Sequence, residues 1–208
     1  MLVTPGGGED GYGLVSTALR ALAERAASAR PRTHIVCGPE MSESQRAAVA
    51  QAVAALPGVT AQDFSDDMMS MVAAADVVVA MGGYNTVCEL LTLRKRAVLV
   101  PRVAPGVEQC VRAERMAGMG LLRMVHPSDL SPATLMAGID AELTGWRRRE
   151  QRPVLRRLDG LERVTAALFD AIGLRAHAPS RSGVAHSNPS SLREPSWSRR
   201  SAPVPSAC

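Results

Sequence analysis

Short apolar runs alternate along this chain with longer segments in which apolar residues recur every three or four positions. The runs predict strands at residues 2–4, 33–37, 59–63, 77–80, 97–100 and 121–125. The helical spacing predicts helices after Gly11, after Ser42, over residues 66–75, after Gly83, over residues 107–117, after Ser131 and over residues 161–172. Strands and helices that alternate over one unit of this size predict a doubly wound, mostly parallel α/β sheet.

Local signals support several of these boundaries. Ser42 is followed three residues later by Gln45, which is the pattern of a capping box, and Pro57-Gly58 stops the helix behind it. Ser131-Pro132 supplies an N-cap and a first-turn proline for a later helix. The run Val77-Val78-Val79 is apolar on both faces, as expected for a parallel strand buried under helices.

Composition divides the chain into a neutral domain and a basic tail. The hydrophobic fraction of 46% allows a sizeable core, and the aromatic fraction of 3% means that Ala, Val, Leu and Met must build it. Residues 174–208 are rich in Ser, Pro and Arg and carry five arginines and one acid, so residues 1–173 hold 19 basic and 19 acidic side chains. We expect a domain over residues 1–173, a disordered tail over residues 174–208, and no nucleic-acid partner.

Metal and membrane sites are not indicated. The cysteines form no CxxC pair and the histidines do not flank them at ligand spacing, so no metal cofactor is predicted. Apolar runs are too short for a membrane span, which favours a cytoplasmic protein. The arginine-dense segment from Arg147 to Arg157 is interpreted as a solvated face or linker, with peripheral contact to an anionic lipid surface as the alternative.

The stretch from Gly82 to Glu89 carries the strongest chemical signal. It joins an apolar strand to an apolar-faced helix, and its two glycines allow the backbone to approach a ligand closely. The helix start offers free N–H groups to a phosphate, and Glu89, one turn further, can accept hydrogen bonds from ribose hydroxyls. Phosphate and ribose together indicate a nucleotide site, and a tight turn with a favourable first-turn acid is the alternative.

Three further loops also leave the carboxyl ends of predicted strands. They are residues 6–11, residues 64–68 and residues 101–109. Because carboxyl ends of parallel strands share one edge of the sheet, these loops predict one continuous cleft. The first loop is neither a GxGxxG fingerprint nor a Walker A loop, which disfavours a dehydrogenase or a P-loop enzyme.

Taken together, the four loops resemble the donor-binding, C-terminal half of GT-B glycosyltransferases, in particular the family 28 (MurG-type) enzymes and related predicted glycosyltransferases. The resemblance covers roughly residues 1–145, and its most specific parts are residues 64–68, residues 75–79 and the run Gly83-x-x-Thr86-Val87-x-Glu89. It implies a Rossmann-like sheet, a hexosyltransferase activity and a UDP-sugar donor, UDP-GlcNAc-like, with no other cofactor.

The resemblance also implies roles for individual residues. Gly7 and Gly8 would face the donor diphosphate, residues around Phe64, Ser65 and Met68 would hold the uracil, Thr86 would meet a phosphate, Glu89 would bind the ribose, and Gln109 would contact the donor sugar. Gly82, Gly83 and Asn85 complete the expected donor site. The chain departs from the family pattern at Glu9, Asp10, Gly106 and Glu108. Acids beside a diphosphate are unfavourable unless they turn toward sugar hydroxyls or a cation.

A GT-B enzyme has two halves, and the acceptor-binding half is not recognisable here. His34 and His126 are interpreted as structural, so no catalytic base is assigned, and the base would have to come from a missing or separate N-terminal domain. We therefore expect an isolated chain without turnover, truncated or half of a split enzyme. The alternatives are a nucleotide-sugar-binding module without transferase activity, or a fragment of a GT-B-type UDP-sugar epimerase.

Overall fold

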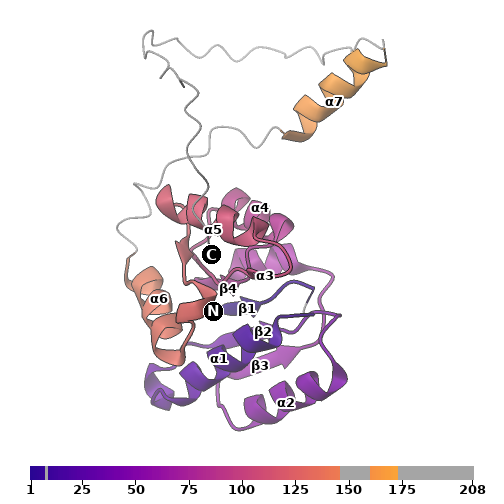
Figure 1. Cartoon of the computed structure of the whole chain (residues 1–208). Helices are drawn as coiled ribbons and strands as arrows, with labels where there is room; N and C mark the ends of the chain where they lie inside the picture. Colours follow the sequence, from indigo (N-terminus) through magenta and orange to yellow (C-terminus); the bar gives the residue numbers. More distant parts are fainter. Residues whose placement is uncertain (8, 146–159, 173–208) are drawn as a thin grey trace. The chain divides into compact units, whose positions relative to one another are not determined.

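A computed structural model describes residues 1–7, 9–145 and 160–172 of this chain. Residues 1–145 lie in one compact unit, and the helix α7 (Gly160–Ala171) lies in another. Figure 1 labels the helices and strands of both units. The boundary expected at residue 173 and the expected disorder of residues 174–208 stay predictions, because the tail lies outside the described residues.

The first unit is built on a parallel sheet. Its strands are β1 (Leu2–Thr4), β2 (Thr33–Val36), β3 (Val59–Gln62), β4 (Val78–Ala80), β5 (Ala97–Leu99) and β6 (Arg123–Met124). They are arranged in the order β3-β2-β1-β4-β5-β6, and every neighbouring pair is parallel. The chain proceeds outward from β1 in one direction and then resumes at β4 on the other side. The carboxyl ends of β1 and β4 therefore flank the topological switch point, where such sheets bind ligands.

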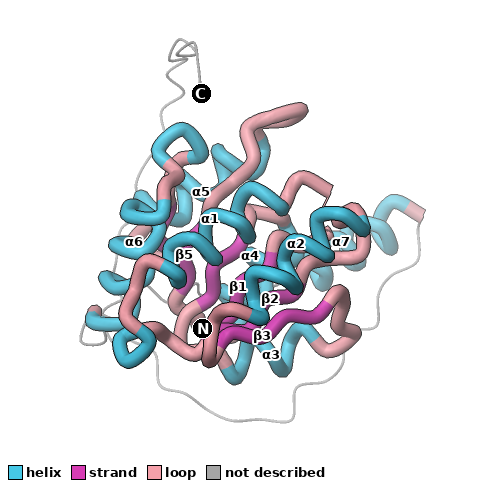
Figure 2. Tube along the Cα trace, turned by 90° about the horizontal axis from the view of Figure 1, so that it is seen from below, coloured by secondary structure: helices cyan, strands magenta, loops and turns pink. Residues whose placement is uncertain are grey.

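Helices cover both faces of this sheet (Figure 2). They are α1 (Tyr12–Ala23), α2 (Glu43–Ala54), α3 (Met68–Ala74), α4 (Tyr84–Thr92), α5 (Glu108–Gly118) and α6 (Pro132–Thr144), with short 3₁₀ turns at Ala27–Ala29 and Pro127–Asp129. Buried side chains of α1, α2 and α6 pack with Val3, Val79 and Val98, whereas those of α3, α4 and α5 pack with the alternate strand residues Leu2 and Val78. The two core clusters confirm the doubly wound architecture.

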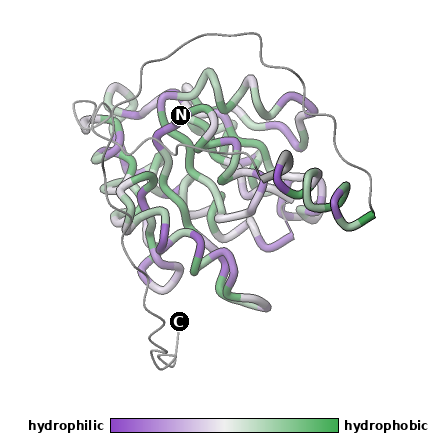
Figure 3. Tube along the Cα trace, turned by 90° about the horizontal axis from the view of Figure 1, so that it is seen from above, coloured by the Kyte–Doolittle hydropathy of each residue, from purple (hydrophilic) through white to green (hydrophobic). Residues whose placement is uncertain are grey.

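Aliphatic side chains fill both core clusters. The buried hydrophobic residues of the described part are Leu, Val, Ile, Ala, Met and Cys, without an aromatic residue among them. The central strands consequently carry the hydrophobic colour in Figure 3. The expectation that Ala, Val, Leu and Met build most of this core is confirmed.

The predicted helix caps are confirmed, but several predicted strands are too long. Ser42 and Gln45 form the reciprocal capping box, and Ser131 caps α6 with Pro132 in its first turn. The strand expected over residues 121–125 is reduced to β6, and the helix expected from residue 66 begins at Met68. Apolar residues continue past the ends of some strands, as at Val77 and Val100, which are buried although they lie outside β4 and β5.

Candidate functional site

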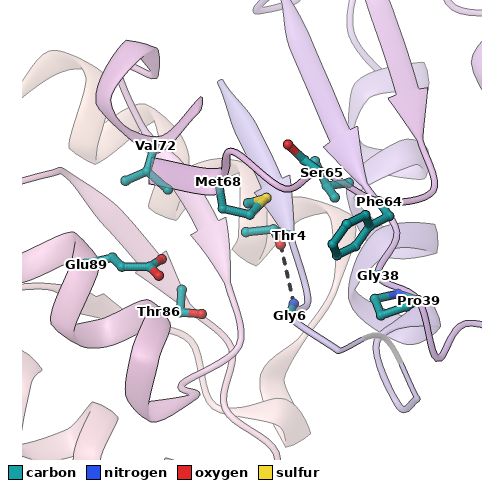
Figure 4. A pocket seen from close by; sticks show the side chains of 11 residues that line it. Thr4, Gly6, Gly38, Pro39, Phe64, Ser65, Met68, Val72, Thr86 and Glu89 are labelled. Carbon is teal, nitrogen blue, oxygen red and sulfur yellow. Dashed lines mark hydrogen bonds between the residues drawn. The ribbon is translucent and has the colours of Figure 1, made fainter. Parts of the chain in front are cut away.

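A pocket opens at the carboxyl edge of the sheet, beside the switch point. Its lining comes from the ends of β1 and β2, from the segment before α3, and from α3 and α4 themselves (Figure 4). The lining residues are Thr4, Gly6, Val36, Gly38, Pro39, Phe64, Ser65, Met68, Val72, Thr86 and Glu89. Segments that are distant in sequence thus converge where a doubly wound sheet is expected to bind its ligand.

The loop after β1 lies against the loop after β2 without any side chain between them. Gly38 has a φ of +91°, and a Cβ atom built on it would lie 2.3 Å from the carbonyl oxygen of Gly6 and 2.5 Å from that of Gly7. The amide of Glu40 donates to the Gly7 carbonyl at 2.8 Å, and the amide of Gly6 donates weakly to Thr4 Oγ1 at 3.4 Å. Only glycine at position 38 allows this contact.

The segment after β3 is held by its own polar side chains. Gln62 Nε2 donates to the carbonyl of Phe64 at 2.9 Å, and Ser65 Oγ accepts from the amide of Asp67 at 3.1 Å. The Phe64 side chain is 60% exposed, so its ring lies at the mouth of the pocket with an unpacked face. An aromatic face beside a hydroxyl can stack a base and position its polar edge.

Helix α4 presents a hydroxyl and a carboxylate to the same pocket. Thr86 and Glu89 are three residues apart and therefore lie on one face, and both point toward the space beside Met68 (Figure 4). Gly83 occupies the N-cap position, and no side chain caps this helix. Among the described residues, the Glu89 carboxylate has no hydrogen-bond or ion-pair partner, so it remains available to vicinal hydroxyls.

The two glycines before α4 have different surroundings. A Cβ atom on Gly82 would lie 3.0 Å from the carbonyl oxygen of Gln109, whereas one on Gly83 would have only Thr86 Oγ1 at 3.9 Å. The guanidinium of Arg112 donates to the Gly82 carbonyl and lies 5.7 Å from the centroid of the Tyr84 ring. Gly82 thus packs closely against α5, whereas the backbone at Gly83 has open space beside it.

An arginine joins two further loops at this edge. Arg102 Nη1 lies 3.6 Å from a carboxylate oxygen of Asp10, and its Nη2 lies 3.5 Å from one of Glu108. The amide of Arg102 donates to Gln109 Oε1 at 3.3 Å. Asp10 therefore faces a cation. An acid in this loop was expected to turn either toward sugar hydroxyls or toward a cation, and Asp10 does the latter.

The structure brings together some of the predicted site residues and separates others. Phe64, Ser65, Met68, Thr86 and Glu89 line one pocket. Gly7 precedes Asp10 in the adjoining loop, Gly82, Gly83 and Asn85 surround the start of α4, Gln109 lies in the first turn of α5, and Gly8 lies outside the described residues.

Sequence reasoning missed several lining residues, namely Thr4, Val36, Gly38, Pro39 and Val72. A signal existed for two of them, because Gly38-Pro39 directly follows a predicted strand and so had to lie at its carboxyl end. Nothing in the sequence gave the order of the strands, which places that end next to β1.

The described histidines make local contacts away from this pocket. His34 Nδ1 lies 2.8 Å from Thr60 Oγ1 on the neighbouring strand. His126 Nδ1 lies 3.2 Å from the amide of Ser128 and caps a 3₁₀ turn. Within the described residues, no group of three potential metal ligands occurs, and no helix is long and apolar enough to cross a membrane.

Two titratable groups near the edge have shifted pKa values. Hydrogen bonds from Ser70 lower the pKa of Asp67, which caps α3. Burial raises the pKa of the Cys37 thiol, and the charge of Asp63 raises it further. The Cys37 side chain at the end of β2 is therefore held as an unreactive thiol.

The parallel sheet, the uncapped helix start and the carboxylate at the switch point are features expected of a nucleotide-binding α/β domain. The match to the Glycosyltransferase family 28 C-terminal domain extends over residues 3–153, and the chain belongs to this family. The resemblance drawn from the four loops is confirmed.

Similar proteins support the same assignment. The chain is 37% identical over 91 residues to a UDP-N-acetylglucosamine--N-acetylmuramyl-(pentapeptide) pyrophosphoryl-undecaprenol N-acetylglucosamine transferase of Anaeromyxobacter sp., covering 43% of this chain and 24% of that protein. It is 31% identical over 139 residues to the Methylobacterium sp. transferase of the same name, covering 65% and 37%. The chain thus spans well under half the length of these curated relatives.

Solved structures share the fold at low sequence identity. The Acinetobacter baumannii MurG structure superposes with a TM-score of 0.64 at 21% identity, covering 82% of this chain and 49% of that one. The glycosyltransferase VinC in complex with dTDP gives a TM-score of 0.59 at 19% identity, covering 83% and 41%. In both, the shared part is about half of the larger enzyme or less.

Proposed function

We propose that this chain is the donor-binding half of a hexosyltransferase and binds a UDP-sugar, UDP-GlcNAc-like. One observation carries the proposal: Thr86 and Glu89 of α4 face the same pocket as Phe64, Ser65 and Met68. The aromatic ring and the hydroxyl suit a base, the free carboxylate suits the two ribose hydroxyls, and the uncapped start of α4 suits a phosphate. The pocket and the start of α4 thus offer a suitable group for each part of a nucleoside diphosphate: the base, the ribose and the phosphates.

The donor class is supported by the relatives. The curated transferases carry UDP-N-acetylglucosamine in their names. A structural neighbour was crystallised with a different nucleotide diphosphate, dTDP, so the base needs a direct test. Phe64 and Ser65 are the residues proposed to distinguish the bases, whereas Glu89 is proposed to require the ribose.

The proposed chemistry is transfer from a diphosphate leaving group. Negative charge builds up on the diphosphate as the glycosidic bond breaks, and the N–H groups at the start of α4 stabilise that charge without a metal. The acceptor hydroxyl needs a base within hydrogen-bond reach. Because His34 and His126 make other contacts, we assign the base and the acceptor site to a separate or missing GT-B half.

Calorimetric titration of the full chain tests the donor class. We expect UDP and UDP-GlcNAc to bind, dTDP to bind more weakly, and NAD not to bind. Tighter binding of NAD than of UDP would overturn the proposal. A parallel assay of sugar transfer should detect none until an acceptor-binding half is added, and turnover by the pure chain would contradict the assignment of the base to another polypeptide.

A further inference from the structure

The bridge from Asp10 through Arg102 to Glu108 crosses the candidate site. Asp10 follows β1 and Arg102 follows β5, and β4 lies between these two strands in the sheet. An ion pair between the two loops therefore spans the carboxyl end of β4, where the backbone turns at Gly82 and Gly83 into α4.

The charges around this bridge are unusual for a phosphate-binding edge. Asp10 and Glu108 contribute two carboxylates, and Arg102 pairs with both of them through separate nitrogens, at 3.6 Å and 3.5 Å. The third guanidinium nitrogen, Nε, is buried and has no hydrogen-bond partner among the described residues. Without the arginine, two negative charges would face the start of α4 and oppose a diphosphate there.

The loop after β5 is tied to the start of α4 by the same residues. The amide of Arg102 donates to Gln109 Oε1 at 3.3 Å. The backbone of Gln109 in turn lies close to Gly82, since a Cβ atom at position 82 would lie 3.0 Å from the Gln109 carbonyl oxygen. Glu108 also occupies the space beside Gly106, since a Cβ atom at position 106 would lie 2.3 Å from its carboxylate. Gly106 therefore leaves room for the carboxylate that pairs with Arg102.

We propose that Arg102 is a positioning residue for the diphosphate of the donor. It neutralises Asp10 in the loop after β1 and Glu108 at the start of α5, so that the start of α4 accepts a dianionic group. This inference rests on the proposed function, and it deepens that function by assigning the diphosphate end of the ligand to residues in which this chain departs from the family pattern.

The experiment compares ligands that differ only in their phosphates. Uridine and UDP are titrated into the full-length wild type and into Arg102→Gln at two salt concentrations. Arg25→Gln is the control, because Arg25, just after α1, pairs with Asp140 of α6. We expect Arg102→Gln to lower the affinity for UDP about tenfold, and less at high salt, while the affinity for uridine is unchanged. The control variant should bind both ligands like the wild type.

A second variant should change the affinity for UDP in the opposite direction. Asp10→Asn combined with Glu108→Gln keeps the arginine and removes the repulsion, so its affinity for UDP should rise several-fold while its affinity for uridine stays the same. Weaker UDP binding in both variants would make the bridge purely structural and overturn the inference, as would unchanged UDP binding in both. Failure of the wild type to bind either ligand would instead overturn the proposed function.

Discussion

Gly38 and Gly6 approach so closely that a Cβ atom at position 38 would lie 2.3 Å from the Gly6 carbonyl oxygen. This contact joins the loops after β1 and β2 and forms one wall of the pocket that we assign to the donor. Because Gly38 also has a φ of +91°, both its space and its backbone conformation exclude a side chain. This wall of the pocket therefore depends on a residue that has no side chain.

Gly38→Ala should therefore be much more disruptive than an ordinary glycine substitution. We expect a loss of about 3 kcal/mol or more in the free energy of unfolding, from backbone strain and from the clash with two carbonyls. Gly58→Ala is the matched control, since Gly58 has a φ of +83° and open space around its Cβ position, and should cost about 1–2 kcal/mol. Urea denaturation measures both, and equal losses would contradict the close contact at position 38.

Glu89→Ala should weaken UDP binding by about 1–3 kcal/mol, the range for hydrogen bonds to a charged group. The wild type should also prefer UDP over 2′-deoxy-UDP, because the carboxylate is expected to accept from both ribose hydroxyls, and the variant should lose this preference. Glu43→Ala, in the first turn of α2, is the control and should leave both affinities unchanged. Retained discrimination in Glu89→Ala would place the ribose elsewhere.

Thr86→Val tests the phosphate contact with little change in side-chain volume. We expect UDP affinity to fall by about 0.5–1.5 kcal/mol, the net worth of one hydrogen bond, while uridine affinity is unchanged. Thr92→Val, at the exposed end of the same helix, is the control. Titration calorimetry with the two ligands provides the measurement, and an equal effect on uridine would show that the hydroxyl does not act on phosphate.

Asp67 gives the chain a pH-dependent element of stability. Its pKa is lowered from 3.8 by the hydrogen bonds with Ser70, so the folded state favours the charged form. The stabilisation is present above the unfolded-state pKa and is lost as the pH falls through the lowered folded-state value. The stability difference between the wild type and Asp67→Ala should therefore be constant near pH 7 and narrow below about pH 4. A difference independent of pH in thermal denaturation would contradict this.

Much of the fold followed from local patterns. The capping box of Ser42 and Gln45 and the cap at Ser131 act within a few residues, so their geometry is encoded where they occur. The apolar run at residues 77–79 indicated a strand buried on both faces, and its valines are fully buried at and beside β4. The spacing of Thr86 and Glu89 likewise fixed their common face once a helix was predicted.

The sequence by itself determined the alternation of strands and helices, the carboxyl-end position of the candidate loops and the choice of Glu89 as a candidate ribose-binding carboxylate. Only the tertiary structure decided the strand order, which brings Gly38 against Gly6, and the partners of Asp10, since Arg102 lies far from it in the chain. The physical reason is the range of the interactions: caps and periodicity act between near neighbours, whereas glycine contacts and ion pairs between loops depend on which strands are adjacent.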